Sequence, residues 1–129
     1  MLSEGRNRQR KMEFVYIEDL VPKDHILRKI DKYIDFSFIN DLCRPYYCEK
    51  NGRPAIEPEI MFKMLFIGYL FGIRSETRLI EDVKVNIAYR WFLGYGIEDK
   101  IPDASVIWQN RLRRFNGTDI PRRIFENIL

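Results

Sequence analysis

The segment from residue 59 to residue 71 constrains the fold of this chain more than any other, because it is apolar on nearly every side of a helix. Pro58 precedes it at the first-turn position that proline favours in helices. Its apolar positions are Met61, Phe62, Met64, Leu65, Phe66, Ile67, Tyr69 and Leu70. A helix without a polar face must be surrounded by other helices. Lys63 interrupts the run, which is also shorter than the roughly 20 residues of a membrane span, so we expect a buried central helix.

Shorter amphipathic helices are predicted around this central helix from capping residues and helical spacing. Asp24 can cap a helix whose apolar positions are Ile26, Leu27, Ile30 and Ile34. Ser37 can cap a short helix through Leu42, and Ser75 a helix that buries Leu79, Ile80 and Val83. A further helix around residues 87–93 ends at Gly94. No alternation of apolar and polar residues is long enough for a sheet, so the expected class is all-α, a compact multi-helix domain.

One helical domain is expected over residues 12–129, preceded by a basic arm. The chain has 129 residues, 46% hydrophobic and 14% aromatic, which is ample for one core. Residues 1–11 carry Arg6, Arg8, Arg10 and Lys11 with no apolar group to bury, which predicts a mobile arm, and residues 12–17 can be briefly extended. No apolar leader of a signal peptide is present. The sequence stops at Leu129 within an amphipathic pattern, which suggests that more protein normally follows.

Positive charge is concentrated near the end of the sequence. Residues 105–129 hold five arginines and two acids, a balance that equals the +3 formal charge of the whole chain. Residues 105–115 read as a helix, with Asp103 or Ser105 at its start. On a helical wheel Ala104, Trp108, Leu112 and Phe115 share an apolar arc, and the opposite side carries Val106, Gln109, Asn110, Arg113 and Arg114. Arg111 falls within the apolar arc, so it must snorkel, pair with an acid, or indicate a different register.

This polar, basic face has the groups that read DNA in the major groove. Glutamine and asparagine form paired hydrogen bonds with adenine, and arginine with guanine, so Gln109, Asn110, Arg113 and Arg114 are candidate DNA-binding residues. Ser105 can cap the helix or donate to a phosphate. With the preceding helix and turn the segment resembles a helix-turn-helix, although residues 94–102 form a longer connection than the usual 3–4 residues. A solvated basic surface helix is the alternative.

Three further arginines, Arg74, Arg78 and Arg90, can add phosphate contacts. Acids lie among them in the sequence: Glu76, Glu81 and Asp82. We therefore expect these arginines mainly to form salt bridges on an exposed face. Phosphate binding by Arg78 and Arg90 is the functional alternative.

Neither a metal site nor an active site is predicted. Cys43, Cys48 and His25 supply three ligands at best, and we expect both cysteines to be reduced, as in a cytosolic protein. The acids Asp82, Asp99, Asp103 and Asp119 lie at helix starts or in loops, where capping explains them better than convergence on two metal ions. We expect no cofactor and no catalysis by this chain.

Five blocks of the sequence, in order, resemble the N-terminal domain of bacterial insertion-sequence DDE transposases of the InsH-like type. They are LVPKDHILRK at 20–29, NGRPAIEP at 51–58, FKMLFIGYLFGIRS at 62–75, NIAYRWFLG at 86–94 and PDAS at 102–105. The resemblance implies a helical DNA-binding domain that precedes a catalytic domain, in which three acidic residues on an RNase H-like sheet bind magnesium. The sequence ends before any such segment, so no residue here inherits a catalytic role and magnesium is expected only for that absent domain.

The sequence departs from the family at the start of the predicted reading helix. After Pro102 and Asp103 the family usually has His, Ser and Thr, whereas this chain has Ala104, Ser105 and Val106. Trp108 stands where a small polar residue is common in the family. These differences put the original DNA specificity in doubt and fit a decaying element or a truncated gene.

The expected function is sequence-specific binding to double-stranded DNA at the terminal inverted repeats of the chain's own mobile element, in the bacterial cytoplasm at the nucleoid. No membrane or small-molecule partner is expected. The alternative is a protein-interaction module or an inactive remnant, in which the central helix and residues 120–129 pair with a second copy or a full-length transposase. A self-contained nuclease is a third, weaker hypothesis.

Overall fold

The computed structural model describes residues 12–44, 56–110, 122, 123 and 126, with side chains through residue 107 and at the last three positions. Its helices are α1 (Ile17–Leu20), α2 (Ile26–Tyr33), α3 (Phe38–Cys43), α4 (Pro58–Leu70), α5 (Glu76–Val85), α6 (Ile87–Leu93) and α7 (Ala104–Asn110). No strand occurs in this part of the chain, which confirms the all-α prediction. Within the same residues, no helix combines the length and apolar character needed to cross a bilayer.

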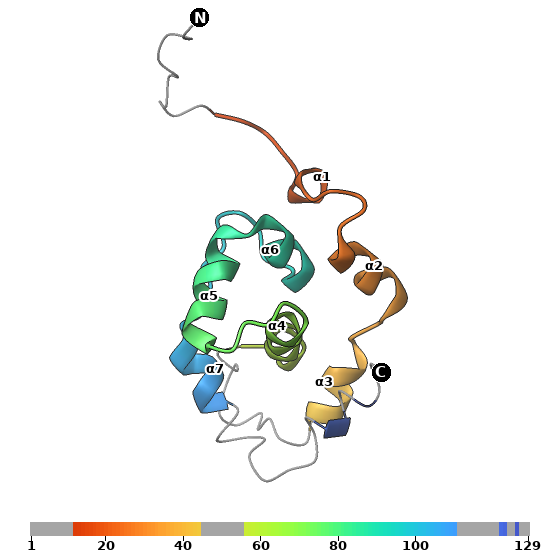
Figure 1. Cartoon of the computed structure of the whole chain (residues 1–129), viewed down its shortest axis with the longest axis vertical. Helices are drawn as coiled ribbons and strands as arrows, with labels where there is room; N and C mark the ends of the chain where they lie inside the picture. Colours follow the sequence, from red (N-terminus) through yellow and green to blue (C-terminus); the bar gives the residue numbers. More distant parts are fainter. Residues whose placement is uncertain (1–11, 45–55, 111–121, 124–125, 127–129) are drawn as a thin grey trace, which may run out of the picture.

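Helix α4 lies at the centre of the fold, as its apolar pattern predicts (Figure 1). Helices α3, α5 and α6 all pack against it, and Met61, Met64 and Ile67 have no exposed surface. Burial is not complete, because Tyr69 near the end of α4 is 75% exposed. The buried side of α4 is occupied by helices of its own chain, so it is not available to a partner protein.

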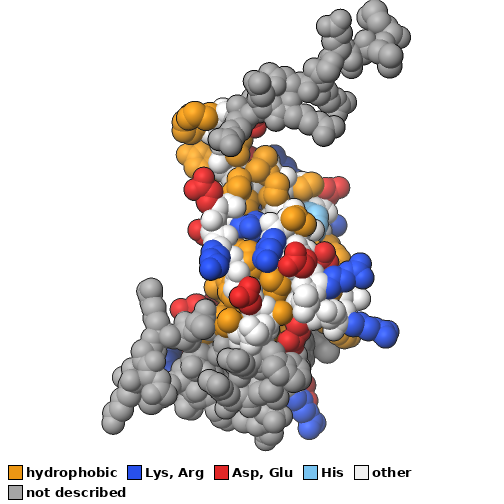
Figure 2. Space-filling view, turned by 90° about the vertical axis from the view of Figure 1, so that its left-hand side faces the viewer, with side chains coloured by type: hydrophobic (Ala, Val, Ile, Leu, Met, Phe, Trp, Pro, Cys, Tyr) orange, Lys and Arg blue, Asp and Glu red, His pale blue; other side chains and the backbone are white. Residues whose placement is uncertain are grey.

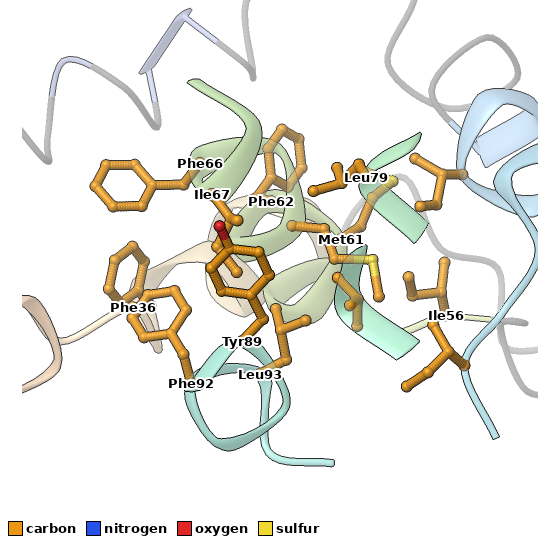
Figure 3. Packing of buried hydrophobic residues seen from close by; sticks show 14 of the residues in the cluster. Phe36, Ile56, Met61, Phe62, Phe66, Ile67, Leu79, Tyr89, Phe92 and Leu93 are labelled. Atoms are coloured by element: carbon orange, nitrogen blue, oxygen red, sulfur yellow. The ribbon is translucent and has the colours of Figure 1, made fainter. Parts of the chain in front are cut away.

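Lys63 within α4 is accommodated by aromatic rings, a carbonyl group and the Glu59 carboxylate, which lies 3.8 Å from its Nζ. Its Nζ lies 5.2 Å from the ring centroid of Phe36 and 5.0 Å from that of Phe92. The same ammonium donates to the Phe92 carbonyl oxygen at 3.2 Å. Phe36 and Phe92 themselves meet edge to face, with centroids 5.5 Å apart (Figure 3). Lys63 thus satisfies one of the carbonyls left unpaired in the last turn of α6.

Helix α2 begins one residue later than Asp24 suggests. The N-cap is His25, whose Nδ1 accepts a hydrogen bond from the Leu27 backbone N–H at 3.1 Å. A turn in which the His25 N–H donates to the Pro22 carbonyl places His25, and not Asp24, at the cap. Leu27 is fully buried, whereas Ile26 is 45% exposed, so Ile26 is a surface position and not a core position.

The other capping predictions have mixed outcomes. Ser75 caps α5 with its side chain, and Gly94 ends α6 in the left-handed conformation at φ 89°. Pro58 occupies the first turn of α4 as expected. Ser37 precedes α3 but makes no side-chain cap; its backbone N–H donates to the Asp35 carboxylate at 2.9 Å instead. Cys43 is a free, buried thiol, and Cys48 lies outside the described residues.

An additional helix, α1, forms at Ile17 directly after the extended residues, and a polar cluster fastens it to the domain. Arg28 on α2 donates to the Glu18 carboxylate at 2.6 Å and lies 4.7 Å from the ring centroid of Trp91 on α6. The Trp91 indole N–H also donates to Glu18. Because Arg28 further donates to the Val21 carbonyl at 2.9 Å, one guanidinium joins α1, the following loop and α6.

Candidate nucleic-acid interface

Helix α7 contains the beginning of the predicted DNA-reading helix, and it packs against α5 (Figure 1). It starts at Ala104, between the two predicted starts, Asp103 and Ser105. Ile107 is the anchor of α7, with no exposed surface, while Ala104 and Val106 are half-buried. Ser105 is exposed. One side of α7 therefore faces the core through Ile107, and Ser105 lies on a side that solvent reaches.

This burial adds Ile107 to the predicted apolar side of the helix. Ile107 was not placed in the apolar arc of Ala104, Trp108, Leu112 and Phe115, yet it is the most deeply buried side chain described on α7. Ala104 from that arc packs against the core, and so does Val106, which was predicted on the polar side. The side chains of Trp108, Leu112 and Phe115 lie outside the description, so the rest of the arc stays a prediction.

The connection between α6 and α7 is longer than that of a simple helix-turn-helix, and Arg90 holds it in place. The Arg90 Nη1 donates to the carbonyl oxygens of Gly96 at 2.8 Å and Asp99 at 3.0 Å. Its Nε donates to the Lys84 carbonyl at 3.0 Å, in the last turn of α5. Ile101 is buried and anchors the end of the connection. Arg90 therefore fixes the segment that delivers the chain to α7.

The principal packing partner of α7 is α5, which also contacts α6. The observed unit is accordingly a group of three helices in which α5 supports both others, and not a pair formed by α6 and α7 alone. The buried side chains of α5 are Leu79, Ile80 and Val83, as predicted from the sequence. They belong to the same hydrophobic core as Ile107 of α7.

Apart from Arg90, the predicted DNA-binding residues fall into three groups in the structure. Ser105 and Arg78 are described and exposed, on α7 and α5 respectively. Gln109 and Asn110 belong to the last turn of α7, but their side chains lie outside the description. Arg113 and Arg114 are outside the described residues, as is Arg111, whose place in the apolar arc stays a prediction.

Arg74 and Arg78 take no part in a salt-bridged face among the described residues. In the part of the chain that the structure describes, neither Arg74 nor Arg78 makes an ion pair, and both side chains are exposed. Glu81 pairs with Lys84 at 3.3 Å instead. Arg90 is half-buried and donates to carbonyl oxygens. Arg78 is thus available to an anion, whereas Arg90 has a structural role that the sequence did not reveal, because its carbonyl partners lie in a loop of no regular pattern.

Metal binding has no support in the described ranges. No three His, Cys, Asp or Glu side chains come close enough together there to hold an ion. Asp82, Asp99 and Asp103 are spread over α5, the connection and the residue before α7. Asp99 instead closes a turn, in which its carboxylate accepts the Gly96 N–H at 2.6 Å. Asp119 lies outside the described residues.

Comparison with families of known proteins gives one finding. Residues 15–113 match the family described as Transposase domain (DUF772), which covers every helix from α1 to α7. Neither the comparison with curated proteins nor that with solved structures gives a significant match.

Proposed function

Because the chain belongs to the transposase domain family DUF772, we propose that it binds double-stranded DNA at the terminal inverted repeats of a mobile element. In this proposal it is the InsH-like N-terminal domain of a DDE transposase and acts at the bacterial nucleoid. The observation that carries the proposal is the way in which α7 packs on the domain. Its core side is fixed through the buried Ile107, and its exposed side begins with Ser105 at the start of the most basic part of the sequence.

The residues divide by the kind of DNA contact that their chemistry suits. Gln109, Asn110 and Arg113 are proposed to read base edges in the major groove, since amides pair with adenine and guanidinium with guanine. Ser105, Arg114 and Arg78 are proposed to bind phosphate, which fixes register without reading sequence. Arg90 is not retained as a contact, because its Nε and Nη1 donors bind backbone carbonyls.

No catalytic step is assigned to this chain. Strand cleavage and transfer by a DDE transposase need three converging carboxylates with magnesium, and the described residues hold no such cluster. We propose that this chemistry belongs to a separate catalytic domain.

The test is a titration of fluorescent duplex DNA with the protein at two salt concentrations, comparing an element end with a scrambled duplex of equal length. We expect tight, salt-sensitive binding with preference for the element end. Arg113→Ala should weaken binding to the element end by about 1–3 kcal/mol and relax the preference at one base pair. Lys32→Ala removes an exposed charge on α2, whose packing partner is α6, and serves as the charge-matched control.

Two results would contradict the proposal. The first is equal, weak binding of both duplexes, which would indicate that the chain is an inactive remnant or an assembly module. The second is an Arg113→Ala variant with unchanged affinity and preference, in a parent protein that does prefer the element end. It would show that another part of the protein reads the DNA sequence.

A further inference from the structure

A groove separates the loop after α1 from the junction of α5 and α6. It has a volume of about 590 Å³. Leu20 and His25 line one side, and Asp82, Val85, Ile87 and Tyr89 line the other. No residue of α7 lines the groove, whose walls come from the end of α1, the loop before α2, α5 and α6. It is therefore a separate surface from the candidate nucleic-acid interface.

The walls of this groove expose apolar side chains, and this exposure does not stabilise a monomer. Val85 is 82% exposed, and Leu20 and Ile87 are each 40% exposed. Clustered exposed apolar residues mark interaction sites more often than isolated ones do. Asp82 adds one acidic group, half-buried, which makes no hydrogen bond or ion pair with the residues that the structure describes. The groove thus offers an apolar surface and an unpaired carboxylate.

The segment immediately before α1 is the chemical complement of this groove. Residues 12–16 read Met-Glu-Phe-Val-Tyr, and Met12, Phe14 and Tyr16 are 88%, 97% and 78% exposed. In an extended chain alternate residues point to the same side, so these three side chains form one apolar edge. Arg10 and Lys11 directly precede the segment in the sequence and supply positive charge. Their charge is opposite to that of Asp82.

The direction of the segment favours a groove on another molecule. Tyr16, the N-cap of α1, has an extended conformation with φ −89° and ψ 134°. The segment before it leads away from the helices (Figure 1), and apolar side chains gather at the upper end of the face shown in Figure 2. Leu20, which ends α1, already lines the chain's own groove only four positions after Tyr16. For residues 12–16 to reach the groove of their own chain, the backbone would have to reverse its direction just before α1. The extended backbone of Tyr16 makes no such turn.

We propose that residues 12–16 of one copy bind in the groove of a second copy, and that the exchange is reciprocal. Each junction would bury Phe14 against Val85 and Ile87. Because segment and groove are adjacent in each copy, two copies related by a two-fold axis can satisfy both junctions at once. The proposal does not depend on DNA binding, since none of these residues belongs to α7.

Self-association of the full chain tests the proposal directly. Sedimentation equilibrium over a range of concentrations should show a monomer–dimer equilibrium. Phe14→Glu in the segment and Val85→Glu in the groove should each weaken the dimer by roughly tenfold or more, as expected when an aromatic anchor or its pocket is removed. Tyr33→Glu changes another exposed aromatic residue, at the last position of α2, and should leave the equilibrium unchanged. Circular dichroism verifies that each variant is folded.

A mixing experiment separates exchange between copies from fold-back within one copy. Phe14→Glu keeps an intact groove, and Val85→Glu keeps an intact segment, so the mixture can form one intact junction per heterodimer. We expect the mixture to contain dimer at concentrations where either variant alone is monomeric. A parent protein that stays monomeric at the highest soluble concentration would overturn the proposal. So would a dimer that neither substitution weakens, or a mixture with no more dimer than its parts.

Discussion

At the residue scale, Arg28 connects more of the N-terminal part than any single apolar contact there. It has an 18% exposed side chain that binds Glu18 and the Val21 carbonyl and covers Trp91. Arg28→Ala should lower the free energy of unfolding by about 2 kcal/mol, because this largely buried guanidinium makes several charge-assisted hydrogen bonds. Urea unfolding followed by tryptophan fluorescence measures the change. Lys29→Ala, an exposed neighbour, should stay within about 0.5 kcal/mol.

Glu18 gives the same cluster a defined pH dependence. The pKa of this carboxyl lies below its ordinary value of 4.5, mainly because of the hydrogen bond from Arg28 and secondly because of the hydrogen bond from Trp91. A depressed pKa stabilises the folded state fully above the unfolded value, and this contribution is lost as pH falls through the folded value. The stability difference between the parent and Glu18→Gln should therefore be largest at neutral pH and shrink well below pH 4.5. A difference that stays constant over that range would contradict the assigned contacts.

The buried thiol of Cys43 gives a third residue-level prediction. Burial raises its pKa to about 11, so almost no thiolate exists in the folded protein at pH 8. In a Cys48→Ser background, a thiol reagent should modify Cys43 only at the rate of unfolding, and rapidly once denaturant is added. Stoichiometric labelling of the native protein within the mixing time would show that Cys43 is accessible.

At the element scale, Asn86 links two helices. Its N–H donates to the Asp82 carbonyl at the end of α5, and its side chain accepts the Tyr89 N–H at 3.0 Å at the start of α6. Asn86→Ala should cost about 1 kcal/mol of stability through loss of the N-cap. Thr77→Ala is the control, because this exposed residue lies within α5 and caps nothing. Denaturant midpoints compare the two variants, and equal midpoints would remove the capping role.

The elements that sequence reasoning placed well are those whose ends are fixed by local chemistry. Pro58, Ser75 and Gly94 act through a restricted φ, a side-chain cap and a left-handed residue, none of which needs a distant partner. The start of α2 was wrong by one residue because the turn from Pro22 to His25 decides it. Helix α1 had no signal of its own, and its short span is held by Arg28 and Trp91 from elsewhere in the chain.

At the scale of the whole molecule, the candidate site was only partly predictable. The sequence indicated a basic helix after residue 103. In the structure the first part of this helix, α7, packs against α5. Which side of α7 faces the core depends on its packing against α5, a tertiary contact that leaves no local pattern in the sequence. The different roles of Arg78 and Arg90 could not be distinguished either. Both are arginines among acids in the sequence, and only the folded connection shows which guanidinium is occupied.

Those two arginines allow stability and DNA affinity to be separated in one experiment. Arg90→Ala removes donors to three carbonyls and should lower the free energy of unfolding by about 1–3 kcal/mol. Arg78→Ala removes an exposed charge without an ion pair in the described chain, and its stability should change by less than about 0.5 kcal/mol.

DNA binding should show the opposite pattern. If Arg78 contacts phosphate, Arg78→Ala weakens element-end and scrambled DNA alike and reduces the slope of log affinity against log salt by about 1. Arg90→Ala, measured well below its melting temperature, should keep the parent slope, because its guanidinium binds carbonyls and not DNA. An unchanged slope in Arg78→Ala together with a reduced slope in Arg90→Ala would show that the connection opens on DNA and releases Arg90 to the phosphate backbone.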